Sequence, residues 1–218
     1  MIRGRPRPSR GAVLLAVLPC LLVLTGCTRA VDGVPTAAPR GPLPASAEQL
    51  EARLVTMVPS GLPRLADDAL EPPAGAKRAA DVAGYADDPA REREVLEDYG
   101  YRFGWERFWG TGPARMTGVF VDQFETRAGA AAYAEDLARN DAAHYAGVLQ
   151  DDPIDLPGGC RLLSVDQPGP DLPGPAVFAW CGQGVFSVGV TAVADSVDAA
   201  EEEVRAVLAA QLDRLPPR

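Results

Sequence analysis

The run Tyr99-Gly-Tyr-Arg-Phe-Gly-Trp-Glu-Arg-Phe-Trp109 decides the fold together with the segment that follows it, Met116-Thr-Gly-Val-Phe-Val-Asp-Gln-Phe124. The first run holds six of the chain's fourteen aromatic residues. Large apolar residues at alternate positions predict a β-strand with one face turned toward a core. The second run follows a Gly-Thr-Gly-Pro turn, so we expect the two runs to form a hairpin.

The aromatic run has two interpretations. Tyr101, Phe103, Trp105 and Trp109 are expected on one face of the strand, interrupted only by Arg107. Trp105, Arg107 and Trp109 are therefore a candidate ligand surface that would stack on a sugar, lipid or peptide. Large aromatic side chains on one face are also what a sheet needs to fill the space beneath covering helices, and we favour that second interpretation.

The hairpin opens a pattern that occurs twice. In the unit at 100–142 the two strands are followed by an amphipathic helix that begins at Thr126. The unit at 175–214 repeats the order, with a last strand over 185–193 and a helix from about Ser196. Two ββα units predict an α+β fold, in which helices cover one face of an antiparallel sheet.

The other segments carry weaker signals. Apolar spacing and capping residues predict a helix over 46–59 and a second helix over 89–98. Residues 60–88 and 150–175 are rich in Pro, Gly and Asp, which is typical of loops. We therefore expect one ordered domain over residues 46–218.

The N-terminus has the architecture of a secretory leader. Residues 1–10 contain four arginines and no acid, and residues 11–24 are apolar but too short to form a comfortable permanent span. Leu24-Thr25-Gly26-Cys27 resembles the lipobox of bacterial lipoproteins. The resemblance implies that residues 1–26 are a signal peptide and that Cys27 is lipidated. An ordinary secretory signal that happens to contain a cysteine, or an uncleaved anchor, is the alternative.

Two further resemblances point in the same direction. The run from Cys27 to Pro35 is similar to the start of many actinobacterial surface lipoproteins. Tyr101-Arg-Phe-Gly-Trp105, the run over 124–130 and Trp180-Cys181 are loosely similar to actinobacterial cell-envelope lipoproteins. Together with the lipobox they imply a lipid-anchored protein on the outer face of the plasma membrane. The composition of the segment after Cys27, rich in Pro, Ala and Gly, predicts that residues 27–45 are a flexible tether. The resemblances imply no activity.

The predicted leader limits the roles that the four cysteines can have. Cys20 leaves with the signal peptide and Cys27 is taken by lipid, so Cys160 and Cys181 remain. In an oxidising compartment a disulfide between them is the default. A two-cysteine metal or redox site is the alternative, but the chain has no CxxC spacing and only one histidine.

The charge limits the choice of partner. The formal net charge is −9, and loss of the leader's four arginines makes it −13. An acidic surface repels nucleic acid and anionic lipid headgroups, so we expect no nucleic-acid partner. The predicted contacts are the membrane, through lipid on Cys27, and an unidentified envelope ligand or protein.

No motif in the chain predicts catalysis, a cofactor or a metal site. H-E-x-x-H, G-x-S-x-G and P-loop patterns are all absent. His144 has no nucleophile near it in sequence, and acidic pairs such as Asp151-Asp152 precede prolines, where Asp is an ordinary turn former. A non-catalytic binding module is the first hypothesis, an accessory lipoprotein that acts only through a protein partner is the second, and an enzyme is the third.

Overall fold

The computed structural model describes residues 42–167, 169 and 172–216. The predicted signal peptide 1–26, the lipidation site Cys27 and the tether as far as residue 41 lie outside the described residues. These parts of the prediction therefore stay predictions.

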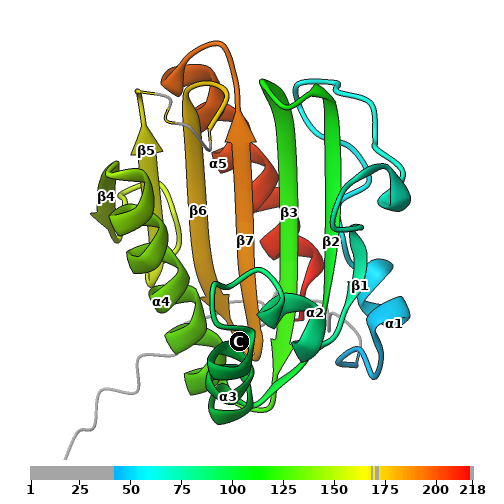
Figure 1. Cartoon of the computed structure of the whole chain (residues 1–218). Coiled ribbons are helices and arrows are strands. Elements are labelled where there is room, and N and C mark those ends of the chain that lie inside the picture. Colours follow the sequence, from blue (N-terminus) through cyan, green and yellow to red (C-terminus); the bar gives the residue numbers. More distant parts are fainter. Residues whose placement is uncertain (1–41, 168, 170–171, 217–218) are drawn as a thin grey trace, which may run out of the picture. The chain divides into compact units, whose positions relative to one another are not determined.

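Seven strands of the described residues form one antiparallel sheet, and with the helices they confirm the predicted α+β class (Figure 1). In spatial order the strands are β1 (Gly75–Lys77), β2 (Tyr101–Gly112), β3 (Arg115–Phe124), β7 (Phe186–Val193), β6 (Ala176–Gln183), β5 (Cys160–Val165) and β4 (Val148–Asp151). The hairpins β2–β3 and β6–β7 meet in the middle, where Val119 pairs with Val190. The two hairpins expected from the sequence are thus the centre of the sheet.

The helices begin where their capping residues indicate. They are α1 (Ala47–Glu51), α2 (Ala79–Ala83), α3 (Pro89–Tyr99), α4 (Arg127–Tyr145) and α5 (Val197–Arg214), with a short 3-10 helix over Asp67–Ala69. The Thr126 side chain accepts a hydrogen bond from the N–H of Gly129, and Ser196 accepts one from Ala199. Each cap satisfies one of the free N–H groups of a first helical turn. Both ββα units are therefore present.

Helices cover both faces of the sheet, so the prediction that they cover one face is wrong. In Figure 1, α4 lies in front of β5 and β6, while α5 lies behind the sheet. On β6, Val177 and Ala179 belong to the core under α5, and Phe178 and Trp180 belong to the core under α4. A strand that is apolar on both faces needs a cover on each.

The predicted helix over 46–59 is also wrong in length, because α1 ends at Glu51. Long-range bonds hold the following residues in another conformation. The N–H of Val55 donates to the side chain of Gln211 at 2.9 Å, and the carbonyl of Val55 accepts from Arg107 at 2.9 Å. Leu54 is still buried, whereas Met57 is 78% exposed.

The segments predicted as loops contain three short strands, the helix α2 and the 3-10 helix over Asp67–Ala69. β1 and α2 lie within 60–88, β5 lies within 150–175, and β4 overlaps the start of the latter. A strand of three residues shows no period of its own, and β1 exists because Ala76 pairs with Trp105 on β2. Pairing with distant residues decided these elements.

The aromatic strand β2 does not keep Tyr101 on the face expected for it. The pairing with β3 shifts between Tyr101 and Phe103, and such a bulge turns the residues before it to the other face. Tyr101 consequently packs edge to face on Phe124, with ring centroids 5.5 Å apart, in the core cluster under α3 and α4. Phe103 packs against the opposite core.

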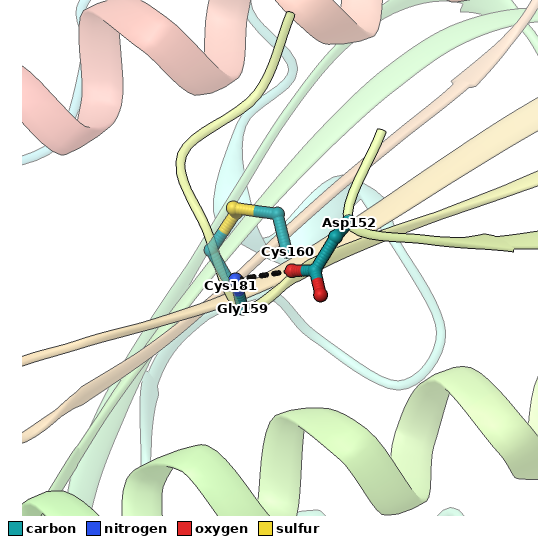
Figure 2. Close-up of a disulfide and its surroundings, with 4 residues drawn as sticks. All are labelled: Asp152, Gly159, Cys160 and Cys181. Atoms are coloured by element: carbon teal, nitrogen blue, oxygen red, sulfur yellow. Dashed lines mark hydrogen bonds between the residues drawn. A yellow bond between two sulfur atoms is a disulfide. The ribbon is translucent and has the colours of Figure 1, made fainter. Parts of the chain in front are cut away.

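Cys160 and Cys181 form a disulfide, as the sequence predicted (Figure 2). They are direct cross-strand neighbours on β5 and β6, with Cα atoms 4.2 Å apart. Figure 2 also shows the Asp152 carboxylate, which accepts a hydrogen bond from the N–H of Gly159 at 2.6 Å. That bond closes the turn that leads into Cys160.

Candidate functional site

The structure places the predicted ligand surface in the core. Trp105, Arg107 and Trp109 lie on the face covered by α5 and α1, and they are 8%, 4% and 1% exposed. The Arg107 guanidinium donates to the Glu51 carboxylate at 2.9 Å and borders a shallow hollow of about 410 Å³. Since these side chains are buried or already engaged, the interpretation of the aromatic run as core accounts for them.

A groove lies on the opposite face of the sheet, between α2 and α4. It has a volume of about 350 Å³. Figure 1 shows the two helices that flank it, with β3 and β7 between them. We call it the aromatic groove, and it is lined by Val82, Tyr85, Glu106, Phe120, Asp122, Tyr133, Leu137, Asp141, Tyr145, Phe178, Trp180, Ser187, Gly189 and Thr191.

Small residues on β7 make the face hollow. Ser187, Gly189 and Thr191 form the floor, while Phe120 and Trp180 stand on the neighbouring strands β3 and β6. A Cβ atom at Gly189 would make only ordinary contacts, 3.5 Å from the Cβ of Phe120 and 3.7 Å from the Trp180 ring. The space above the central strand is therefore open because its side chains are short.

One wall of the groove is a stack of three aromatic rings. The Tyr145 and Phe178 rings are 5.1 Å apart and nearly parallel, and the Phe178 and Trp180 rings follow at 5.8 Å. Tyr145 comes from the end of α4 and the other two from β6. Stacked in this way, the three rings cover much of one another's faces and form one continuous apolar wall.

Glu106 is the first of three carboxylates in the groove, and it already has partners. The ammonium of Lys77 lies 3.1 Å from its carboxylate, and the Tyr85 hydroxyl donates to it at 3.0 Å. Burial raises the pKa of Glu106, while Lys77 and Tyr85 oppose that rise. Lys77 is itself buried, donates to the carbonyl of Pro73 and lies 5.4 Å from the centroid of the Tyr85 ring.

Asp122, on β3, is the second carboxylate. It accepts a hydrogen bond from the Tyr101 hydroxyl at 3.0 Å. Burial raises the pKa of Asp122 to about 7, and the Tyr101 bond only opposes the rise. Gly104 leaves the space for this pair, because a Cβ there would lie 2.1 Å from the Asp122 carboxylate and 2.7 Å from the Tyr101 oxygen.

Asp141 on α4 is the third carboxylate. Burial raises its pKa to about 6, and nearby His144 opposes the rise. His144 is exposed near the end of α4 and does not line the groove. Tyr133, also on α4, is buried among these acids, so its pKa is raised well above the ordinary value.

A second hollow, of about 270 Å³, lies beside α5 and is lined in part by Glu203. The Glu203 carboxylate accepts from the N–H and the hydroxyl of Ser60, at 2.9 and 2.6 Å, and from the Thr117 hydroxyl at 3.1 Å. These bonds tie the loop after α1 to β3 and α5. Because the acid is fully engaged, we assign it a structural role.

The described residues contain no group of three His, Cys, Asp or Glu side chains that could hold a metal ion. Sequence reasoning missed the groove because its residues come from six elements. A signal did exist: Glu106 and Asp122 interrupt predicted strands, and Ser187-x-Gly189-x-Thr191 alternates small residues on one face. Only the pairing of the strands brings these positions together.

No curated protein matches this sequence. Among solved structures, the chain is similar to the extracellular domain of PknH from Mycobacterium tuberculosis, at 14% identity and a TM-score of 0.46. That match covers 80% of this chain and 100% of the other. A family model described as "Domain of unknown function (DUF7373) N-terminal" matches residues 40–216. Since the match spans most of the sequence, the chain belongs to the DUF7373 family.

Proposed function

We propose that this protein is a lipid-anchored, extracytoplasmic module that binds a small organic ligand in the aromatic groove without transforming it. The observation that carries the proposal is the groove itself, with a volume of about 350 Å³ and walls of aromatic and aliphatic side chains. Ligand sites are typically concave, mostly apolar and furnished with a few polar groups. The aromatic groove has each of these properties.

Two features support an extracytoplasmic location. The leader carries the three-part pattern of a secretory signal that ends at Cys27. The disulfide between Cys160 and Cys181 is of a kind that persists in oxidising compartments. Within the described ranges, the structure contains no helix that is both long and apolar enough to cross a membrane. Attachment through lipid on Cys27 is part of the proposal.

Nucleophilic catalysis of the triad type would require a nucleophile, a base and an orienting group in mutual contact. The groove holds the Ser187 and Thr191 hydroxyls and three carboxylates, but His144 stands outside its lining. Glu106 is tied to Lys77 and Tyr85, which is the arrangement of a structural ion pair. We therefore propose a binding role.

An occluded groove tests the binding role. The full chain, purified in nanodiscs, is titrated with the neutral fluorescent probe 1-aminoanthracene, and empty nanodiscs give the background. In Gly189→Leu the new side chain rises from the floor between Phe120 and Trp180. We expect saturable binding to the wild type and at least about tenfold weaker binding to Gly189→Leu.

Ala206→Leu is the matched control, because it adds a side chain of similar size at an exposed position of α5, behind the sheet. Thermal unfolding of each variant checks that the fold is intact. Saturable binding that Gly189→Leu leaves unchanged would overturn the assignment to this groove, and so would the absence of any saturable binding.

The lipid anchor has its own test. Cells that express the full chain are labelled with an alkyne-bearing fatty acid, and the purified protein is assayed for the label. We expect label on the wild type and on Cys20→Ala, and none on Cys27→Ala. Label that persists on Cys27→Ala would remove Cys27 as the anchor.

A further inference from the structure

We infer that the ligand of the aromatic groove is an organic cation, an ammonium group attached to an apolar body, and that Asp122 is its counter-ion. The inference rests on the proposed function and names the ligand class that the site would take. It follows from the charge of the groove, the surroundings of Asp122 and the chemistry of the walls.

Among the described residues, the groove is lined by acidic side chains and by no basic one of the lysine or arginine type. Three of the lining residues are acidic. Lys77 contacts the lining residue Glu106 from outside the groove, and its ammonium is engaged by Glu106, by the carbonyl of Pro73 and by the Tyr85 ring. The groove therefore offers no cation to a phosphate, sulfate or carboxylate ligand, and it would repel one.

Asp122 is the carboxylate with which a ligand cation would form an ion pair. Lys77 acts on it only from a distance, and in the described part of the chain no lysine or arginine forms an ion pair with Asp122. Its carboxylate keeps acceptor positions beyond the single bond from Tyr101. A carboxylate removed from bulk water without a cation carries a large desolvation cost, and an ammonium bound beside it would reduce that cost.

The walls suit the same ligand. Aromatic ring faces attract ammonium groups, and the lining of the groove includes six aromatic rings, among them Tyr85, which is 48% exposed. The protein already makes this contact internally, between Lys77 and Tyr85. Aliphatic and aromatic walls at Val82, Leu137 and Phe120 would bury the apolar body. The groove thus offers contacts both to the ammonium group of such a ligand and to its apolar body.

Three probes of similar size and different charge test the inference. The full chain in nanodiscs of zwitterionic lipid is titrated with 2-phenylethylammonium, 2-phenylethanol and phenylacetate, by calorimetry and by the fluorescence of the tryptophans, of which Trp180 lines the groove. A hydrogen bond between charged groups is stronger than one to a hydroxyl, so we expect the ammonium to bind about tenfold more tightly than the alcohol. We expect phenylacetate to bind least.

Variants and pH identify the counter-ion. Asp122→Asn keeps an acceptor for the Tyr101 hydroxyl but removes the charge, and it should abolish the preference for the ammonium. Asp198→Asn removes the same charge from an exposed position on α5 and should preserve the preference. The preference should also shrink as the pH falls through about 7, because Asp122 becomes protonated. The other titratable groups that act on Asp122 are Tyr101, Glu106, Lys77, Tyr85 and Tyr133.

The outcomes separate the two proposals. If the three probes bind equally, or if Asp122→Asn retains the preference, the cation is overturned while the groove remains a ligand site. If phenylacetate binds most tightly, the ligand is an anion and the inference fails in the same way. If Gly189→Leu leaves binding of all three probes intact, or if none of them binds, the proposed groove itself is overturned.

Discussion

Asp122→Asn should make the protein more stable at alkaline pH, and the gain should vanish in acid. In the folded protein the pKa of Asp122 rises from an ordinary 3.8 to about 7. The folded state therefore binds a proton between these values when the unfolded state does not, and stability falls as the pH rises through that window. Asparagine has no proton to lose, and its side-chain carbonyl still accepts from Tyr101.

The size of the effect follows from the pKa. Each pKa unit corresponds to about 1.4 kcal/mol, so the full difference sets an upper limit of roughly 4 kcal/mol at pH 8. Asp122 is only half-buried, because it borders the groove, and water there reduces the cost of its charge. We therefore expect Asp122→Asn to raise the free energy of unfolding by about 2 kcal/mol at pH 8 and by less than about 0.5 kcal/mol at about pH 3.5, below the ordinary pKa of an aspartate.

Urea unfolding of the full chain at several pH values, followed by far-UV circular dichroism, measures this difference. Asp87→Asn is the control, because Asp87 is exposed and its replacement should change stability little at any pH. A gain that does not depend on pH would show that the carboxylate is not the cause. Equal or lower stability of Asp122→Asn at pH 8 would refute the claim that this acid is held at a cost, and with it the reason to expect a cation there.

Three further predictions concern the scaffold. Cys160→Ala with Cys181→Ala should lower the free energy of unfolding by about 3 kcal/mol, since the disulfide closes a loop of roughly 20 residues, and denaturant unfolding with and without reductant checks this value. Lys77→Met should cost about 3 kcal/mol because it leaves Glu106 buried without its cation, and the double variant with Glu106→Gln should recover much of that loss in calorimetry. Gly129→Ala should lower the melting temperature although alanine favours helices, because a Cβ at this position would lie 2.0 Å from the carbonyl oxygen of Tyr99. Gly189→Ala is the control and should fold normally, because the atom nearest to its Cβ would be 3.5 Å away.

The elements that sequence reasoning placed correctly are those with a strong local pattern. Strand β7 alternates large apolar residues with small or polar ones, and α3 and α5 begin after the capping residues Asp88 and Ser196. These signals act between residues a few positions apart, so they can be read without knowledge of the fold. β1 and β4 lack such a pattern and form because they pair with neighbouring strands.

The candidate site could not be predicted from such local patterns. Trp105 and Trp109 drew attention because large aromatic residues are conspicuous, yet they fill the core under α5. The groove depends instead on small residues and on an irregular strand register. Gly189 keeps the floor low and Gly104 leaves room for Asp122, while the bulge in β2 turns Tyr101 toward Asp122. None of these properties is visible until the strands are in register.

The amino-acid sequence by itself determined the α+β class, the two ββα units and the cysteine pair, because alternation, helix caps and cysteine count are local or compositional properties. Only the tertiary structure decided that helices cover both faces of the sheet, and that Glu106, Asp122 and Asp141 share a groove with six aromatic rings. The physical reason is that burial and charge compensation depend on neighbours that are distant in sequence, and the packing of β7 between two hairpins brings those neighbours together.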